Sequence, residues 1–250
     1  MSLRVRRAVF AVGALGLAAL LAWGFAGLPA LGDFDGRYGE LISRIAVPQR
    51  TASEVVGTTT LDYRAFDTLG EELILFTAAV GVAVLLRLQR GDRPQPAAAD
   101  AREPTGRSHA LRAMGVALFG PVVLLALYVV THGHLTPGGG FQGGVILMSA
   151  FLLVFLSGAR LRHIGRAPQV EGIELAEGLG VAGFGLIGLG GLLIGSAFLE
   201  NFLPLGRFGE LVSGGTIPLS NIAIALEVMG AMLAILGELL DERLLSQPGK

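Results

Sequence analysis

Long apolar runs, nearly free of charged residues, recur along the 250-residue chain. They cover residues 8–31, 73–86, 113–130, 141–156, 178–199 and 211–237. Because a bilayer core of about 30 Å is spanned by about 20 helical residues, each run predicts a membrane helix. The runs are continuous rather than alternating, which disfavours the strand pattern of a barrel. The sequence therefore predicts an all-α integral membrane protein with about six transmembrane helices.

The polar segments divide the chain into three parts. Residues 1–90 are predicted to form a two-span module with a long outer loop, and residues 109–245 a four-span domain. Residues 91–108 are rich in Pro, Ala and charge without an apolar stripe, which indicates a cytoplasmic linker. The first run also resembles a cleavable signal peptide, but it is longer than the apolar stretch of such peptides, so we expect an uncleaved anchor.

The distribution of basic residues predicts the orientation. With the N-terminus inside, 14 of the 19 Lys and Arg residues lie in cytoplasmic segments and 5 lie in outer loops. Positive charge favours the cytoplasmic side of a membrane. The sequence therefore predicts an N-in/C-in topology.

Composition excludes several classes of function. Hydrophobic residues make up 52% of the chain and charged residues 16%, and Cys is absent, so a disulfide scaffold, a thiolate metal site and a Cys nucleophile are excluded. A net charge of −1 argues against a nucleic-acid partner. No nucleophile elbow, zinc signature or phosphate loop is present, so we expect neither an enzyme nor a bound cofactor. The 38 glycines favour close helix packing, either within the bundle or against other subunits.

Carboxylates gather where the second membrane helix begins. The run 73–86 has only 14 residues, so the helix is expected to start near Thr68 and to bring Glu71 and Glu72 to the membrane margin. Ionisable groups at that depth often mark ion paths, which makes Glu71, Glu72 and Asp67 candidates for a cation path. The alternative is that these residues stabilise the start of the helix. Thr68 and Glu71 match a capping box, and the negative charge of Asp67 interacts favourably with the helix dipole.

Glu227 lies well inside the last apolar run. At 100° per residue it shares a small, partly polar face with other residues, which should point into protein. These are Ser220, Ala223, Ala231, Ala234 and Glu238. A carboxylate there must be protonated, paired or in contact with water, so Glu227 is a candidate ion or proton group. The alternative is a protonated Glu that links helices by a hydrogen bond.

The segment between the third and fourth runs has an unusual composition. Pro137 favours a turn or helix start, and Gly138, Gly139 and Gly140 permit unusual backbone angles. We therefore expect a tightly folded segment that lines a cavity. His134 is a candidate proton-handling group. A metal site at His132 and His134 lacks a third ligand, and we expect none.

Residues 133–144 read G-H-L-T-P-G-G-G-F-Q-G-G, which resembles the G-H-x-x-P-G-G-G-F-x-G-G signature of the MnhB (MrpB) subunit of Mrp-type multisubunit Na⁺/H⁺ antiporters. The resemblance covers about residues 108–245 and implies four spans. The matching positions are Gly133, His134, Pro137, Gly138, Gly139, Gly140, Phe141, Gly143 and Gly144.

Residues 62–71 read D-Y-R-A-F-D-T-L-G-E and are similar to a motif in the C-terminal region of the A-type subunit of the same antiporters. Related membrane-bound hydrogenase complexes carry this module as a separate small subunit. The sequence has Ala65 where Gly is usual. The chain thus looks like an MnhB-type subunit fused to a two-span module.

The resemblance implies a multi-pass subunit in a bacterial cytoplasmic membrane, with other antiporter subunits and lipid as partners. The transported ions would be Na⁺ and H⁺, and the chain would contribute to the sodium side. By position, Asp67, Glu71, His134, Pro137 and Phe141 inherit the family's functional interest. The alternatives are a subunit of a related hydrogenase or ferredoxin-driven respiratory complex, and a purely structural spacer.

Overall fold

A computed structural model describes residues 3–28, 32, 36–86, 109–157 and 170–246, and these divide into two compact units. The first unit ends at Leu41 and is dominated by α1 (Leu3–Ala26), a single apolar helix whose described side chains are exposed. The predicted linker 91–108 lies outside the described residues.

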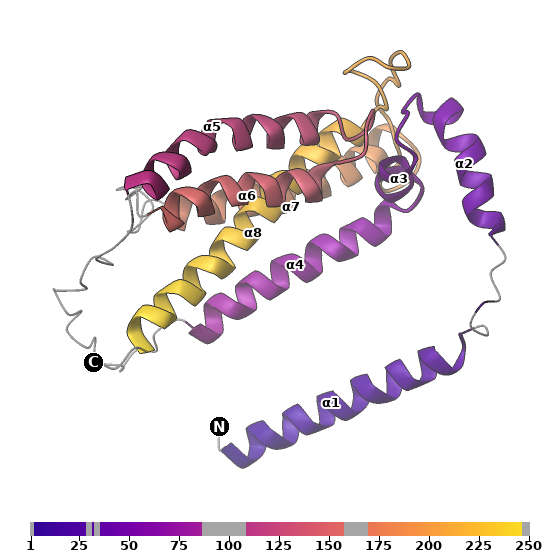
Figure 1. The fold of residues 1–250 in the computed structure, drawn as a ribbon. Helices are drawn as coiled ribbons and strands as arrows, with labels where there is room; N and C mark the ends of the chain where they lie inside the picture. The colour runs from indigo at the N-terminus through magenta and orange to yellow at the C-terminus, as the bar shows by residue number, and fades with distance from the viewer. Residues whose placement is uncertain (1–2, 29–31, 33–35, 87–108, 158–169, 247–250) are drawn as a thin grey trace. The chain divides into compact units, whose positions relative to one another are not determined.

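The second unit begins at Ile42 and is a bundle of five long helices (Figure 1). These are α4 (Ala65–Leu86), α5 (His109–Thr131), α6 (Gly140–Leu156), α7 (Val170–Ile194) and α8 (Ile217–Ser246). Helix α8 packs against each of the other four, and α5 packs along α6. The bundle core includes Phe184, Ile224 and Val228, and Leu69 and Leu75 of α4 pack against it.

The predicted all-α membrane fold is confirmed. Helices α1, α4, α5, α7 and α8 are long and apolar enough to cross a bilayer, and α6 is a shorter apolar helix of 17 residues. Within the described residues no strand occurs, and a single antiparallel bridge joins Gly206 to Ser213. The N-in/C-in orientation stays a prediction.

The helix ends differ from those the apolar runs predict. Helix α8 begins at Ile217 rather than near residue 211, because Gly214 and Gly215 have φ values of +77° and +65° and break the helix before it starts. Helix α7 begins at Val170, so it extends beyond the apolar run into a charged segment. Helix α4 begins at Ala65, three residues before the expected start.

The segment between the first two predicted membrane helices contains helices that the sequence does not predict. They are α2 (Arg37–Arg50), the four-residue α3 (Val55–Thr58) and a π-helix, η1 (Thr59–Tyr63). Helix α2 is polar overall and buries few side chains, so it lacks the apolar run that marks the other helices. Glu54 is the N-cap residue of α3, and its carboxylate accepts hydrogen bonds from the N–H groups of Val56 and Gly57.

Candidate ion-path site

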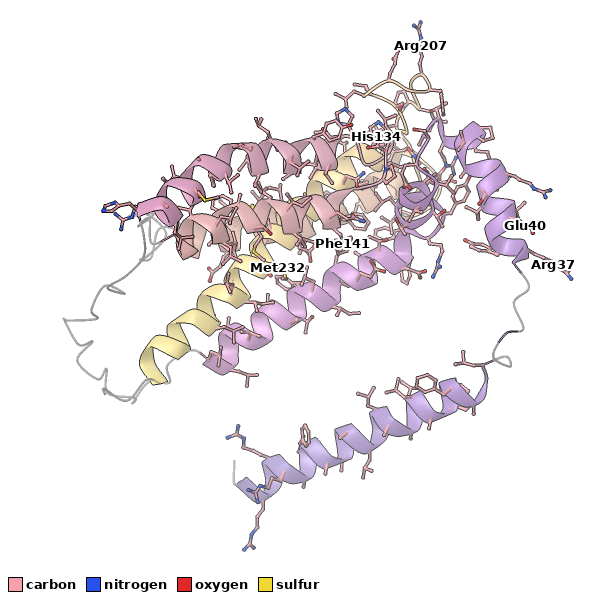
Figure 2. The ribbon with its side chains drawn as sticks, viewed as in Figure 1. Arg37, Glu40, His134, Phe141, Arg207 and Met232 are labelled. Carbon is pink, nitrogen blue, oxygen red and sulfur yellow. The ribbon has the colours of Figure 1, made fainter. Side chains whose placement is uncertain are left out.

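The two motif segments meet at one pocket of about 120 Å³. Helix α4 and the segment before it supply Thr60, Thr68 and Glu71, while the turn before α6 supplies the three glycines of residues 138–140. Gln142 and Asn221 complete the polar lining. In Figure 2, Phe141 lies in the first turn of α6, and His134 lies on the loop that precedes it. The pocket is therefore rich in oxygen atoms and carries one carboxylate.

The glycine turn depends on backbone angles that favour glycine. Gly138 and Gly139 have φ values of +152° and +127°, and the Gly139 N–H donates to the carbonyl of Val129 at 3.2 Å. A Cβ at Gly139 would lie 2.9 Å from Oδ1 of Asn221. That Oδ1 accepts a hydrogen bond from the N–H of Gly140 at 2.7 Å, which ties the turn to α8. The Nδ2 of Asn221 is buried without a hydrogen-bond partner among the described residues.

The structure separates the three carboxylates at the start of α4. Asp67 is exposed and accepts a hydrogen bond from Nε of Arg64 at 2.6 Å. Glu71 lines the pocket and makes no ion pair or hydrogen bond with any residue that the structure describes. Glu72 does not line the pocket and is fully buried.

The capping-box interpretation of Thr68 and Glu71 is wrong. Because α4 begins at Ala65, Thr68 lies in its first turn rather than at the cap. The Thr68 hydroxyl donates to the carbonyl of Thr60 at 2.7 Å and so links α4 to η1. Glu71 is thus left free of a capping role.

Buried carboxyl groups occur on three helices of the bundle. The side chains of Glu72 and Glu227 are 0% exposed, and none of their carboxylate oxygens has a hydrogen-bond partner within the described chain. The predicted inward face of α8 is confirmed over its first part, since Ser220, Ala223 and Ala231 are buried with Glu227. Ala234 and Glu238, which continue the face, are only half-buried.

Glu177 of α7 is a third buried acid, 5% exposed, and its Oε1 has no hydrogen-bond partner within the described chain. Sequence analysis missed it because the fifth apolar run begins one residue later. The spacing of Glu174 and Glu177, one helical turn apart, is the signal that could have placed both on α7.

His134 is fully buried in the loop between α5 and α6. Neither ring nitrogen makes a hydrogen bond of good geometry with a described residue, while its backbone carbonyl accepts from the N–H of Glu54 at 3.2 Å. Burial lowers the pKa of the His134 imidazole, and the backbone of Glu210, which lies near the ring, offsets part of that shift. His132 stacks on Tyr128 at 4.1 Å instead. Across the residues described, no group of three His, Cys, Asp or Glu side chains could hold a metal ion.

An ion pair that the sequence did not reveal fixes the outer segment. Nε of Arg50 lies 2.7 Å from Oδ2 of Asp62, although the N–H is not aligned for a hydrogen bond, and the Asp62 side chain is only 5% exposed. Nδ2 of Asn201 donates to the same oxygen at 2.8 Å, and Oδ1 of Asn201 accepts from the N–H of Thr216. This network joins η1 to the start of α8.

Comparison with known proteins adds to this geometry. The family described as a domain related to the MnhB subunit of Na⁺/H⁺ antiporter matches residues 110–234. The B-type subunit of a Na⁺/H⁺ antiporter from Alkalihalophilus pseudofirmus is 34% identical over 46% of this chain and 80% of its own length. A Rhizobium meliloti protein described as a probable A/B-type subunit of a K⁺/H⁺ antiporter is 30% identical to this chain. The match covers 74% of this chain and 20% of the longer relative.

Two solved structures are similar over almost the whole chain. One is a chain of the membrane-bound sulfane sulfur reductase, an archaeal respiratory membrane complex, with a TM-score of 0.66 and 30% identity. The match covers 94% of this chain and 98% of that one. The other is a chain of the Mrp complex from Dietzia sp., with a TM-score of 0.63, 29% identity, and coverage of 96% of this chain and 26% of that one.

Proposed function

Because this chain belongs to the family of domains related to the MnhB subunit of Na⁺/H⁺ antiporters, we propose that it is a membrane subunit of a multisubunit complex that exchanges Na⁺ for H⁺. The chain carries no covalent chemistry and binds no cofactor in this proposal. The observation that carries it is the pocket at which residues of both motif segments, Thr68 and Glu71 on one side and Gly138–Gly140 on the other, come together.

The chemistry of this pocket supports a monovalent cation as its occupant. Hard cations prefer oxygen ligands, and a carboxylate, hydroxyl groups and amide oxygens surround the space. A volume of about 120 Å³ is large enough to hold several water molecules. It suits a cation that keeps part of its hydration shell, with Glu71 as the balancing charge.

The surroundings of Glu71 support companion subunits as partners. In the isolated chain Glu71 is exposed on a helix that also exposes large apolar side chains, such as those of Phe66 and Ile74. A carboxylate directed at lipid is costly, so a neighbouring polypeptide or a hydrated route should cover it. Residues 1–90 act as the module that resembles part of the A-type subunit, in keeping with the A/B-type description of the Rhizobium meliloti relative.

A second candidate function has its own support. The match to the sulfane sulfur reductase chain covers nearly the full length of both chains, which favours a place in a respiratory complex that pumps ions. In that case the chain would copurify with redox subunits, and cation transport would require an electron donor. Cation exchange driven by a pH gradient alone, in a complex without redox subunits, favours the antiporter.

The test uses the whole complex in an antiporter-deficient bacterium and measures Na⁺- and K⁺-dependent proton exchange in everted membrane vesicles. Omitting this chain should abolish exchange. Glu71→Gln should reduce exchange by about ten-fold or more, the equivalent of about 1.4 kcal/mol, in a complex that still assembles. Glu210→Gln, on the exposed outer loop, is the matched control. Full exchange without the chain would contradict the proposed function.

A further inference from the structure

The buried acids of α4, α7 and α8 have no cationic partner in the described bundle. Arg50, Arg64 and Arg207 form ion pairs with other carboxylates. Helix α6 contains no charged residue. Helix α5 carries His109 and Arg112, both in its first turn. Because an unpaired buried charge is costly, the buried carboxyl groups can change their charge only by binding a proton or a cation.

Helices α7 and α8 pack closely and antiparallel where two of these acids lie. A Cβ at Gly180 of α7 would lie 2.7 Å from Cβ of Glu227 and 2.6 Å from the carbonyl oxygen of Ala223. One turn away, a Cβ at Gly230 of α8 would lie 2.8 Å from Cβ of Glu177. Glu177 therefore lies about one helical turn from the level of Glu227.

Other carboxyl groups lie on the helices of this part of the bundle. Glu174 is exposed and lies one turn before Glu177, toward the N-terminal end of α7. Glu72 is a further buried acid on α4, whose Leu69 and Leu75 pack against the core that contains Ile224 and Val228. The pocket lies at the level of Asn221. From Gly230 to Asn221 along α8 is roughly 14 Å at 1.5 Å per residue.

We propose that Glu177 is a proton-exchanging residue that connects the exposed end of α7 with the buried acid Glu227. A proton that arrives from the side of Glu174 binds to a carboxylate oxygen of Glu177 and neutralises it. Its transfer to the next carboxylate restores the charge and readies Glu177 for another proton. The proposal rests on the antiport function and adds to it a residue and an entrance for H⁺, separate from the cation pocket at Glu71.

The experiment compares variants of the full complex in everted vesicles across a pH series. Glu177→Gln should leave assembly intact and reduce exchange by about ten-fold or more. Glu177→Asp should retain exchange and shift its pH profile, which a purely structural residue would not do. Glu210→Gln again serves as the exposed control. Wild-type rates and pH profile for Glu177→Gln would overturn the proposal.

A second measurement keeps the test decisive if Glu177→Gln does not assemble. Dicyclohexylcarbodiimide reacts with protonated carboxyl groups in apolar surroundings, and the wild-type complex can be labelled and analysed by mass spectrometry. We expect labelling of Glu177 that declines as pH rises, and its absence at all pH values would overturn the proposal. Loss of exchange in Glu71→Gln with normal exchange in Glu177→Gln would refute this inference alone. Normal exchange without the chain would instead refute the antiport function.

Discussion

Glu177 and Glu227 lie on facing turns of α7 and α8, and each packs beside a glycine of the other helix. Glu227 lies against Gly180, and Glu177 lies against Gly230, with no space for a Cβ at either glycine. The absence of a side chain at these two glycines therefore leaves the space that the two buried acids occupy. In lipid, small residues allow this close approach of helices.

Replacing Gly180 with Ala should weaken the contact between α7 and α8. The added methyl group would lie 2.4 Å from the backbone nitrogen of Glu227, so one helix must move. We expect a loss of about 1–3 kcal/mol, seen as a lower thermal midpoint of the purified complex. A Cβ at Gly178 meets no atom within 4 Å, so Gly178→Ala is the control. Equal midpoints for the two variants would argue against the packing described for this interface.

Removing the Asp62 carboxylate should loosen the outer segment. Asp62→Ala removes the ion-pair partner of Arg50 and a hydrogen-bond acceptor of Asn201. We expect the free energy of unfolding to fall by about 2 kcal/mol, because Arg50 still reaches water. Faster trypsin cleavage of the segment and a lower thermal midpoint are the measurements. Asp67→Ala breaks an exposed ion pair with Arg64 and should cost under about 1 kcal/mol. A greater effect at Asp67 than at Asp62 would contradict this ranking.

His134 should make stability depend on pH. Burial lowers its pKa in the folded protein below the ordinary value of 6.5, so the unfolded chain binds a proton first as pH falls. The free energy of unfolding should therefore decrease below pH 6.5 and level off under the folded pKa, by at most about 1.4 kcal/mol per pH unit. Thermal midpoints across this range should fall less steeply in His134→Gln. Identical slopes for wild type and variant would show that His134 does not titrate on unfolding.

The glycine turn should control cation affinity. Gly139→Ala places a side chain at a φ of +127° and 2.9 Å from Oδ1 of Asn221, so the turn and the pocket must distort. We expect the Na⁺ concentration for half-maximal exchange to rise about ten-fold, equivalent to about 1.4 kcal/mol. Gly120→Ala in α5, where a Cβ meets no atom within 4 Å, is the control. An unchanged sodium dependence in assembled Gly139→Ala would remove the turn from the cation site.

The sequence was sufficient for the features that depend on hydropathy and periodicity. Each apolar run corresponds to a helix, because a bilayer demands about 20 apolar residues in one segment. The inward orientation of Glu227 followed from the helical repeat, since Ser220, Ala223 and Ala231 share its face and are buried with it. The meeting of the two motifs could not be read in this way, because Glu71 and Gly139 are brought together by tertiary packing.

Other features were missed for identifiable reasons. Glu177 lies just outside the apolar run but inside α7, which begins at Val170. The backbone hydrogen bonds of a helix can continue through charged residues, so the start of the apolar run does not mark the start of the helix. The start of α8 was misplaced because Leu211 and Val212 are apolar yet exposed in a loop. The paired glycines at 214 and 215, followed by Pro218 in the first turn of α8, mark its true start.

The shortness of α6 has an electrical consequence. Its 17 residues span about 25 Å, less than a hydrocarbon core of about 30 Å. We expect the glycine turn at its start, with the pocket beside it, to be the end that lies below the membrane surface. An ion bound there would already have crossed part of the transmembrane field, which acts on a unit charge with about 2.3 kcal/mol per 100 mV over the full thickness. Membrane voltage should consequently change the fraction of pockets that hold a cation, even at a constant concentration of Na⁺.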